Sequence, residues 1–340
     1  IAGAGGCSPY LKSLIEKESE WLETAVDDPE TVLPRLMAEL NETAPDILAM
    51  SLRHANRRVA LLTGLADLGG VWPLETVTQT LTDFADLSVH LALRAAIGAE
   101  IKRGKLPGQT EADAEQAGGM VALAMGKMGA GELNYSSDVD LICLFDETRF
   151  DPDDYYDARA SFVRATRKMC AMLSDITPEG YVFRTDLRLR PDASVTPVCI
   201  AMETAERYYE SLGRTWERAA YIKARACAGD IVAGKRFLKT LTPFVWRKHL
   251  DFAAIQDAHD MVQRIRDHKG LGGPITLPGH NMKLGRGGIR LACPWNGSWP
   301  WPFGAKGLGA AGRGRHPDRP LPRASRGGAQ GADDPRCADP

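Results

Sequence analysis

The sequence predicts an α+β protein in which a small mixed sheet is embedded in a mostly helical array. Apolar residues recur at helical spacing over most of residues 9–115. Two apolar, strand-like segments flank a glycine-rich turn within 121–145, and apolar and polar residues alternate through 181–190. The regions expected from these patterns are a helical region over 1–119, the sheet core over 120–200, a second helical region over 201–290, and an aperiodic, proline-rich tail over 291–340 whose composition indicates disorder.

Several helices are expected before the sheet. An apolar stripe over 11–22 opens the region, and Pro29 and Pro34 predict a break after it. A longer helical run over 47–102 is interrupted near residues 69–73, where two glycines and a proline occur.

The sheet core is expected to follow a polar linker over 103–119. Residues 121–145 read as a strand, a turn and a second strand that carries Asp138 and Asp140. Side chains two residues apart in a strand project to the same face, so both carboxylates lie together in an apolar strand. Their repulsion and desolvation are relieved by a bound Mg²⁺, which prefers oxygen ligands. Gly126, on the turn, lets a nucleotide phosphate approach the backbone.

A third carboxylate lies in the alternating segment over 181–190. We expect a strand with one apolar face and one polar face, the polar face holding Asp186 among Arg184, Arg188 and Arg190. An acid among guanidinium groups suits a metal ligand or a general base beside phosphate-binding groups. Three aspartates, bound metal and an anion clamp favour transfer of a nucleotidyl group.

Each of these motifs has a plainer interpretation when taken alone. An Asp-x-Asp pair is usually a turn or surface feature, and a single glycine-rich turn is common. The combination of Gly-x(11)-Asp-x-Asp with a later acid on an arginine-rich strand is more specific. Residues 119–127 lack the phosphate-loop pattern, and Gly126, Gly129 and Gly131 lack the order of a dinucleotide fingerprint.

Helices are expected around and after the last strand. Residues 155–175 have one apolar face, which we interpret as core packing, and 201–268 return to a helical pattern. Residues 216–218 and 223–225 are placed on one of these helices, where they either support a nucleotide site or form solvated ion pairs. The basic, glycine-rich segment 283–290 either contacts phosphate or starts a helix.

Composition indicates a cytoplasmic protein. The chain has 340 residues, 44% of them hydrophobic and 25% charged, and its net charge of −2 argues against bulk nucleic-acid binding. No apolar run is long enough to span a membrane. The seven cysteines form no CxxC pair, so buried free thiols such as Cys143 and Cys170 are expected in a reducing compartment. The chain opens in mid-pattern without an initiator Met, which indicates a truncated start.

At these motifs the chain resembles a known family. GKMGAGELNYSSDVDLI, at 126–142, is similar to the nucleotidyltransferase signature of the bifunctional glutamine synthetase adenylyltransferase/adenylyl-removing enzymes. Further similarities occur at 8–11, 184–192, 208–225, 243–252 and 280–290, so the resemblance covers about residues 1–290. That family has two nucleotidyltransferase units, of which the first removes AMP from glutamine synthetase and the second attaches it. The LNYSS context before Asp138 is similar to the first unit, so the chain looks like the N-terminal, adenylyl-removing half.

The resemblance implies a polymerase-β-like nucleotidyltransferase core and deadenylylation by phosphorolysis, which regulates nitrogen assimilation. Inorganic phosphate would attack tyrosyl-AMP on glutamine synthetase and release ADP. The resemblance also implies Mg²⁺ as cofactor, adenine nucleotides and phosphate as ligands, and a PII signalling protein as a second partner. The expected catalytic and metal-binding residues are Asp138, Asp140 and Asp186. The expected nucleotide- and phosphate-binding residues are Gly126, Lys127, Gly129, Ser136, Ser137, Arg188 and Arg190.

Two other functions remain open from the sequence. A different nucleotidyltransferase would add AMP or UMP to a protein or small molecule, and the LNYSS context argues against it. An inactive regulatory module would only bind glutamine synthetase or PII. The intact set of acids argues against this module, whereas a truncation at Arg290 favours it. From Leu291 the chain departs from the segment with which the resembled family continues, and this departure implies a frameshifted tail.

Overall fold

The computed structural model describes residues 1–246 and, beyond these, residues 256, 260, 263, 264, 267, 268, 270 and 279–281. The expectations for the tail over 291–340 and for the basic segment 283–290 lie outside the described residues. So does most of the helical pattern expected over 247–268.

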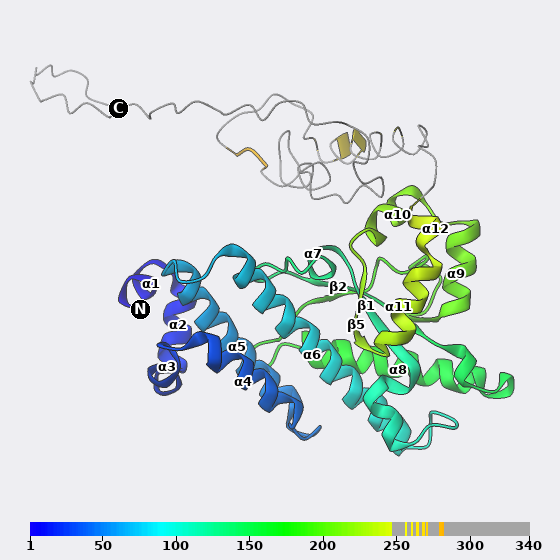
Figure 1. The fold of residues 1–340 in the computed structure, drawn as a ribbon, viewed down its shortest axis with the longest axis horizontal. Coiled ribbons are helices and arrows are strands. Elements are labelled where there is room, and N and C mark those ends of the chain that lie inside the picture. Colours follow the sequence, from blue (N-terminus) through cyan, green and yellow to red (C-terminus); the bar gives the residue numbers. More distant parts are fainter. Residues whose placement is uncertain are drawn as a thin grey trace, which may run out of the picture. The chain divides into compact units, whose positions relative to one another are not determined.

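The chain before the sheet is helical, as the sequence predicts. Its helices are α1 (Ala2–Cys7), α2 (Pro9–Lys17), α3 (Ser19–Ala25), α4 (Pro29–Asn41), α5 (Leu48–Leu68) and α6 (Leu74–Lys102), shown in blue to cyan in Figure 1. The long run is interrupted near residues 69–73, which confirms the expected break there. Pro29 starts α4, but Pro34 lies inside it, so a break at Pro34 is wrong. Four buried apolar side chains of α4 offset the lost hydrogen bond, which costs about 3 kcal/mol in a helix interior.

The expected polar linker over 103–119 has more structure than its composition suggests. It ends in a 3₁₀ element, η1 (Glu111–Gly119), whose last residues are buried. Gly118 and Gly119 both adopt left-handed backbone angles, with φ of 59° and 89°. The first strand begins directly after this turn, at Met120.

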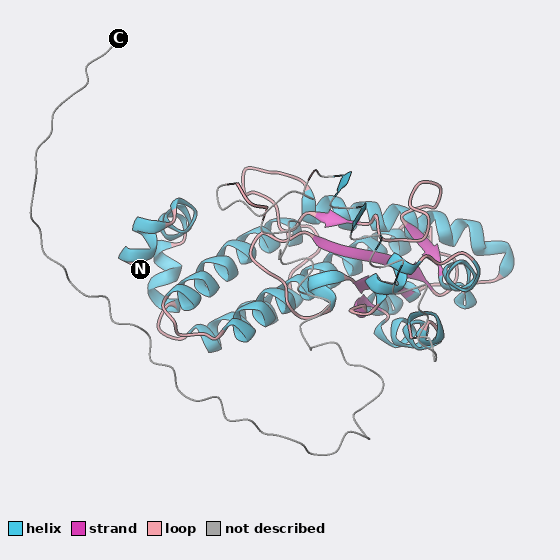
Figure 2. Ribbon diagram, turned by 90° about the horizontal axis from the view of Figure 1, so that it is seen from above, coloured by secondary structure: helices cyan, strands magenta, loops and turns pink. Residues whose placement is uncertain are grey.

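Within residues 1–246, five strands form one mixed sheet. Figure 2 shows the strands lying among the helices. They are β1 (Met120–Ala124), β2 (Val139–Phe145), β3 (Thr185–Asp186), β4 (Cys199–Ala201) and β5 (Arg225–Gly229). β1 pairs antiparallel with both β2 and β5. The other edge of β2 pairs in parallel with β3 at its start and with β4 at its end.

Two predicted elements are wrong in this part of the chain. The strand expected over 181–190 is reduced to Thr185 and Asp186, and the chain turns from Leu187 onward. Residues 225–229, expected to be helical, form β5. Pairing with β1 decides the second case, because a short segment such as RACAG carries no clear period of its own.

The two faces of the sheet belong to different apolar clusters. Val139, Leu141 and Cys143 of β2 pack with α5, α6 and α8 (Tyr155–Ser174), whose apolar face is the predicted core stripe. Ile142 and Leu144 pack on the opposite side. That side is covered by α9 (Met202–Ser211), α10 (Thr215–Tyr221), α11 (Ile231–Thr240) and α12 (Thr242–Val245), drawn in green to yellow in Figure 1.

Within residues 1–246 the five cysteines are free thiols, as expected. Cys143 is buried, as expected, whereas Cys170 is only partly buried. Among the described residues, no helix is long and apolar enough to cross a bilayer.

A buried carboxylate joins α6 to α8. The Glu100 side chain is fully buried and forms ion pairs with Arg103, with Arg164 at 2.9 Å and with Lys168 at 3.2 Å. Burial opposes ionisation, but hydrogen bonds from the three cationic side chains hold the pKa of Glu100 below its ordinary value. The carboxylate is therefore charged in the folded protein at neutral pH.

We expect Glu100→Gln to lower the free energy of unfolding by about 1.5–3 kcal/mol at pH 7, the usual worth of hydrogen bonds to a charged group. Because the folded-state pKa is lowered, this contribution is fully present above the unfolded-state pKa and is lost as pH falls through the folded-state value. Thermal melting of both proteins from pH 7 to pH 3.5 measures it. A difference in melting temperature that does not shrink toward low pH would contradict the assignment.

Candidate functional site

The predicted carboxylates lie at the junction of β2 and β3. Asp140 of β2 is the direct register partner of Asp186 on the parallel strand β3. Asp138 precedes β2 by one residue, and the Val139 N–H donates to the Arg184 carbonyl at 2.9 Å, which extends the pairing past Asp138. Register partners in a sheet project to the same face, as do residues two apart. The structure therefore places the three acids on one face at one edge of the sheet.

Two arginines neutralise the outer acids of this group. Arg184 Nε donates to Asp138 Oδ1 at 2.5 Å, and Arg184 Nη2 donates to the Ser136 carbonyl at 2.7 Å. The Arg188 backbone N–H donates to Asp186 Oδ1 at 2.8 Å, and its Nε lies 2.9 Å from Asp186 Oδ2. The hydrogen bond from Arg188 lowers the pKa of Asp186, against the effect of burial. Asp186 is consequently ionised near neutral pH.

The glycine turn lies directly beside the acids. The short helix α7 (Gly126–Gly129) follows β1, and Gly126 adopts a left-handed φ of 57°. A β-carbon at Gly126 would lie 3.2 Å from Asp140 Oδ2, so the backbone approaches the carboxylate closely. Lys127 is exposed on the same short helix.

Gly129 packs against the backbone of two other segments of the same chain. A β-carbon there would lie 2.0 Å from the Lys223 carbonyl oxygen and 2.6 Å from the Ala124 carbonyl oxygen. Backbone atoms cannot move aside as a flexible side chain can, so only glycine fits. The turn is thus fixed between β1 and the segment that enters β5.

The serines lie on the loop before β2. Ser136 adopts a left-handed φ of 51° and gives its carbonyl to Arg184, and the Ser137 N–H donates to the Asn134 carbonyl at 3.2 Å. This tight turn sets the direction in which Asp138 enters the strand.

Arg190 does not lie with the acids on a strand face. Its guanidinium donates to the carbonyls of Leu187, Ala193 and Thr196, at distances from 2.8 to 3.3 Å. These bonds order the loop that follows β3, which is why the alternation over 181–190 does not continue as a strand. Of Arg188 and Arg190, the two arginines predicted to bind phosphate, Arg188 contacts a site acid and Arg190 does not.

Sequence reasoning missed the partner of Arg184, and its placement of 223–225 on a helix is wrong, because α10 ends at Tyr221 and Arg225 lies in β5. Arg184 was placed on the polar face, but its pairing with Asp138 depends on the parallel contact between β2 and β3. Arg225 forms an ion pair with Asp86 of α6 and donates to the Met128 carbonyl at 3.0 Å. It therefore links α7 to α6. No local pattern signals a contact between residues so far apart.

The region at 216–218 does not form a solvated face. Glu217 is 2% exposed. Its carboxylate accepts from the Arg214 N–H at 2.8 Å and from the Tyr208 hydroxyl at 3.1 Å. Burial raises the pKa of Glu217. Arg218 donates to the Phe244 carbonyl at 3.0 Å, so these residues join α9, α10 and α12.

Over the described residues, no three His, Cys, Asp or Glu side chains are arranged as a complete metal site. The donor chemistry nevertheless fits a hard cation. Asp138, Asp140 and Asp186 present only oxygen ligands on one face, and Asp186 has a lowered pKa. In the structure the guanidinium groups of Arg184 and Arg188 supply positive charge to two of these acids.

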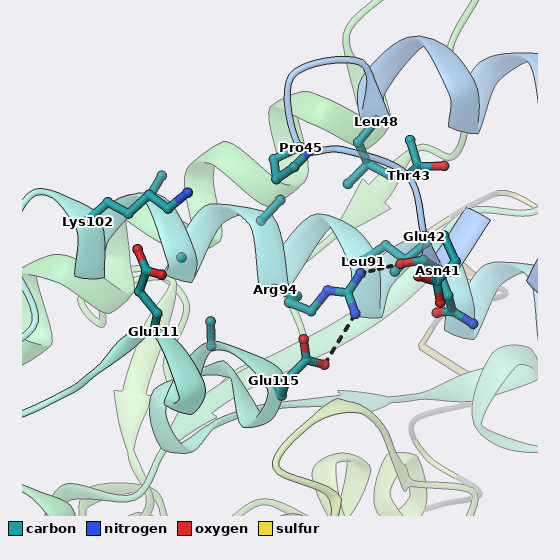
Figure 3. A pocket seen from close by; sticks show the side chains of 14 residues that line it. Asn41, Glu42, Thr43, Pro45, Leu48, Leu91, Arg94, Lys102, Glu111 and Glu115 are labelled. Carbon is teal, nitrogen blue, oxygen red and sulfur yellow. Dashed lines mark hydrogen bonds and ion pairs between the residues drawn. The ribbon is translucent and has the colours of Figure 1, made fainter. Parts of the chain in front are cut away.

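A separate cavity of about 610 Å³ lies between the α4–α5 connection, α6 and η1 (Figure 3). Arg94 crosses it, donating to the Asn41 carbonyl at 2.8 Å and to Glu115 at 3.2 Å. None of the predicted site residues lines this cavity. The acidic edge of the sheet is therefore a different place from this pocket.

A small mixed sheet with carboxylates gathered beside a glycine turn, set among helices, defines a nucleotidyltransferase-like domain. The comparison with family models identifies which one. A model described as glutamate-ammonia ligase adenylyltransferase matches residues 2–240, and the chain belongs to this family.

Curated relatives agree with this assignment. The chain is 50% identical over 299 residues to a bifunctional glutamine synthetase adenylyltransferase/adenylyl-removing enzyme of Bradyrhizobium diazoefficiens, a match that covers 85% of this chain and 30% of that protein. It is 43% identical over 300 residues to the enzyme of the same name from Agrobacterium fabrum, with the same coverage. The chain thus spans about 30% of the length of these relatives.

Proposed function

We propose that this chain removes AMP from adenylylated glutamine synthetase by phosphorolysis and releases ADP. The observation that carries the proposal is the register pairing of Asp140 with Asp186, beside Gly126 and next to Asp138. Family membership supports it, because the relatives' name includes both attachment and removal of the adenylyl group. The LNYSS context before Asp138 favours removal.

Asp138, Asp140 and Asp186 would hold Mg²⁺. When bound there, Mg²⁺ would neutralise charge on the phosphoryl oxygens and on the departing tyrosinate. The protein's own contribution is to hold three carboxylates together at one sheet edge. The lowered pKa of Asp186 keeps it ready to bind a cation.

The arginines and the glycine turn would bind the anionic reactants. The Arg188 side chain is 85% exposed, so it can leave Asp186 and hold phosphate oxygens once another cation satisfies that carboxylate. Gly126 would let a phosphate approach the backbone, and Lys127, Gly129, Ser136 and Ser137 would be the further phosphate-binding residues. We assign Arg190 to ordering the loop after β3. It would support the phosphate site from there without touching phosphate.

The wider expectations belong to the same proposal. They are a polymerase-β-like core over 120–200 between helical regions over 1–119 and 201–290, a cytoplasmic location, and a PII signalling protein as a second partner. The mixed sheet within the predicted core range supports the first of these, although β5 at 225–229 joins it from the following region.

The direct test is release of ADP from adenylylated glutamine synthetase across a titration of inorganic phosphate with Mg²⁺ present. We expect ADP to rise with phosphate to saturation and no consumption of ATP as an AMP donor. Arg188→Gln should raise the phosphate concentration for half-maximal rate about tenfold, the worth of one charge-assisted contact. Arg207→Gln, at an exposed pair on α9, is the matched control.

Other outcomes would point to the remaining functions. Release of AMP without phosphate would indicate hydrolysis, and transfer from ATP to unmodified glutamine synthetase would indicate the attaching activity. Binding of adenylylated glutamine synthetase without turnover would indicate an inactive module.

A further inference from the structure

A single helix, α5, contacts both chain segments that deliver the acids to the site. Its side chains Arg53, Asn56, Arg57 and Asp67 lie within one helical face. The first and last of these are separated by 14 positions, which is roughly 21 Å along the axis. The two ends of this face touch different segments, which are far apart in the sequence.

The N-terminal half of α5 holds the turn before β3. Arg53 is 4% exposed and donates to the carbonyls of Asp175 at 2.7 Å and Gly180 at 2.9 Å. Asn56 donates to the Tyr181 carbonyl at 3.3 Å. A buried guanidinium bound to backbone carbonyls fixes the path of the chain, because an unsatisfied buried charge would be costly. This turn leads within a few residues to Asp186.

Arg57 extends this contact to the start of the chain. It forms ion pairs with Glu179 of the same turn and with Glu18, at 2.9 Å, between α2 and α3. Glu18 is 7% exposed and also binds Arg58 at 2.8 Å. The N-terminal helices therefore hold α5 in place while α5 holds the turn.

The C-terminal half of α5 holds the loop before β2. The Tyr135 hydroxyl donates to Asp67 Oδ2 at 3.0 Å, and burial and this bond raise the pKa of Tyr135. The neighbouring residue Leu133 is held by α6, since its N–H donates to Thr82 Oγ1 at 3.1 Å. This loop leads within three residues to Asp138, so Tyr135 of the LNYSS motif has a positioning role.

We propose that α5 is the positioning element of the acidic site, setting the separation of Asp138 and Asp186 through Tyr135 at one end and Arg53 at the other. The inference rests on the proposed function for its catalytic consequence. The contacts themselves act on backbone placement alone. None of these α5 side chains need touch the reacting groups.

Two conservative variants test the proposal in the full 340-residue chain. Tyr135→Phe removes only the hydroxyl, and Arg53→Lys keeps the charge but cannot bind two carbonyls with a planar fork. For each variant we expect kcat for ADP release to fall about tenfold, because residues that orient ligands without touching the metal have effects of this size. KM for adenylylated glutamine synthetase should stay within about twofold of wild type. The Kd for Mn²⁺, used as the metal probe, should rise about tenfold as well.

Matched controls separate positioning from general damage. Tyr156→Phe, exposed on α8, and Arg35→Lys, exposed on α4, should leave every value unchanged. Asp67→Asn keeps an acceptor oxygen for Tyr135 and should retain kcat, whereas Asp67→Ala should match Tyr135→Phe. In the Tyr135→Phe/Asp67→Ala double variant, the loss should be no larger than in either single variant.

The outcomes distinguish this inference from the proposed function. If the wild-type chain binds Mn²⁺ but releases no ADP, the proposed function fails and the Mn²⁺ affinities still test α5. If it does neither, hydrogen exchange decides: Tyr135→Phe should speed exchange over 133–138, and Arg53→Lys over 176–186. Unchanged kcat and Mn²⁺ affinity in an active chain, a change in KM alone, or unchanged exchange in an inactive one, would overturn the proposal.

Discussion

Asp140→Asn is expected to lower the rate of ADP release by about 10³-fold or more while the protein melts within a few degrees of wild type. The substitution keeps the shape of the side chain but removes a charge beside Gly126 and opposite Asp186. A metal ion supplies several kcal/mol of charge stabilisation in such reactions, and each tenfold in rate is worth about 1.4 kcal/mol. The measurement is single-turnover ADP release at saturating phosphate.

The control for this substitution is Asp157→Asn, an exposed acid in the first turn of α8. It should leave the rate unchanged. The Kd for Mn²⁺ should rise in Asp140→Asn and stay constant in the control. Near-normal turnover by Asp140→Asn would show that the acids at the edge of the sheet do not take part in the reaction. It would leave the description of the fold unchanged.

Gly129→Ala is expected to destabilise the protein strongly, and more than alanine at Gly126 would through steric contact. The new β-carbon would meet two carbonyl oxygens, of Lys223 and Ala124, at 2.0 and 2.6 Å. Relief requires a backbone shift of α7 or of the segment entering β5, at a cost of about 3 kcal/mol or more. The melting temperature should fall by roughly 6–12 °C. The rate of ADP release should also fall, because a shift of α7 would move Gly126.

Gly98→Ala serves as the matched control. That glycine lies within α6, where an added β-carbon would make an ordinary contact at 3.8 Å with Ala114. A helix-interior alanine should be neutral or stabilising by about 1 kcal/mol. If Gly129→Ala had the same melting temperature as wild type, the close approach of α7 to the Lys223 carbonyl would be wrong.

Much of the fold could be predicted because its signals are local. The helices before the sheet follow from apolar spacing, and the strand, turn and strand from 120 to 145 follow from a short glycine-rich segment between apolar runs. The free, buried state of Cys143 follows from the apolar strand that contains it. The side-by-side projection of Asp138 and Asp140 follows from strand geometry alone.

Sequence motifs were enough to predict the family, the nucleotidyltransferase-like class, and the acids and glycine turn of the candidate site. The arrangement of these parts in space depends on contacts between distant segments. Asp186 stands beside Asp140 because β3 pairs with β2 over only two residues, and the chain then turns around Arg190. Residues 225–229 form the strand β5 because they pair with the edge of β1 that β2 does not occupy. Arg184, Arg225 and the face of α5 gained their roles through contacts across more than 40 residues of sequence, and no periodicity in a single chain encodes such contacts.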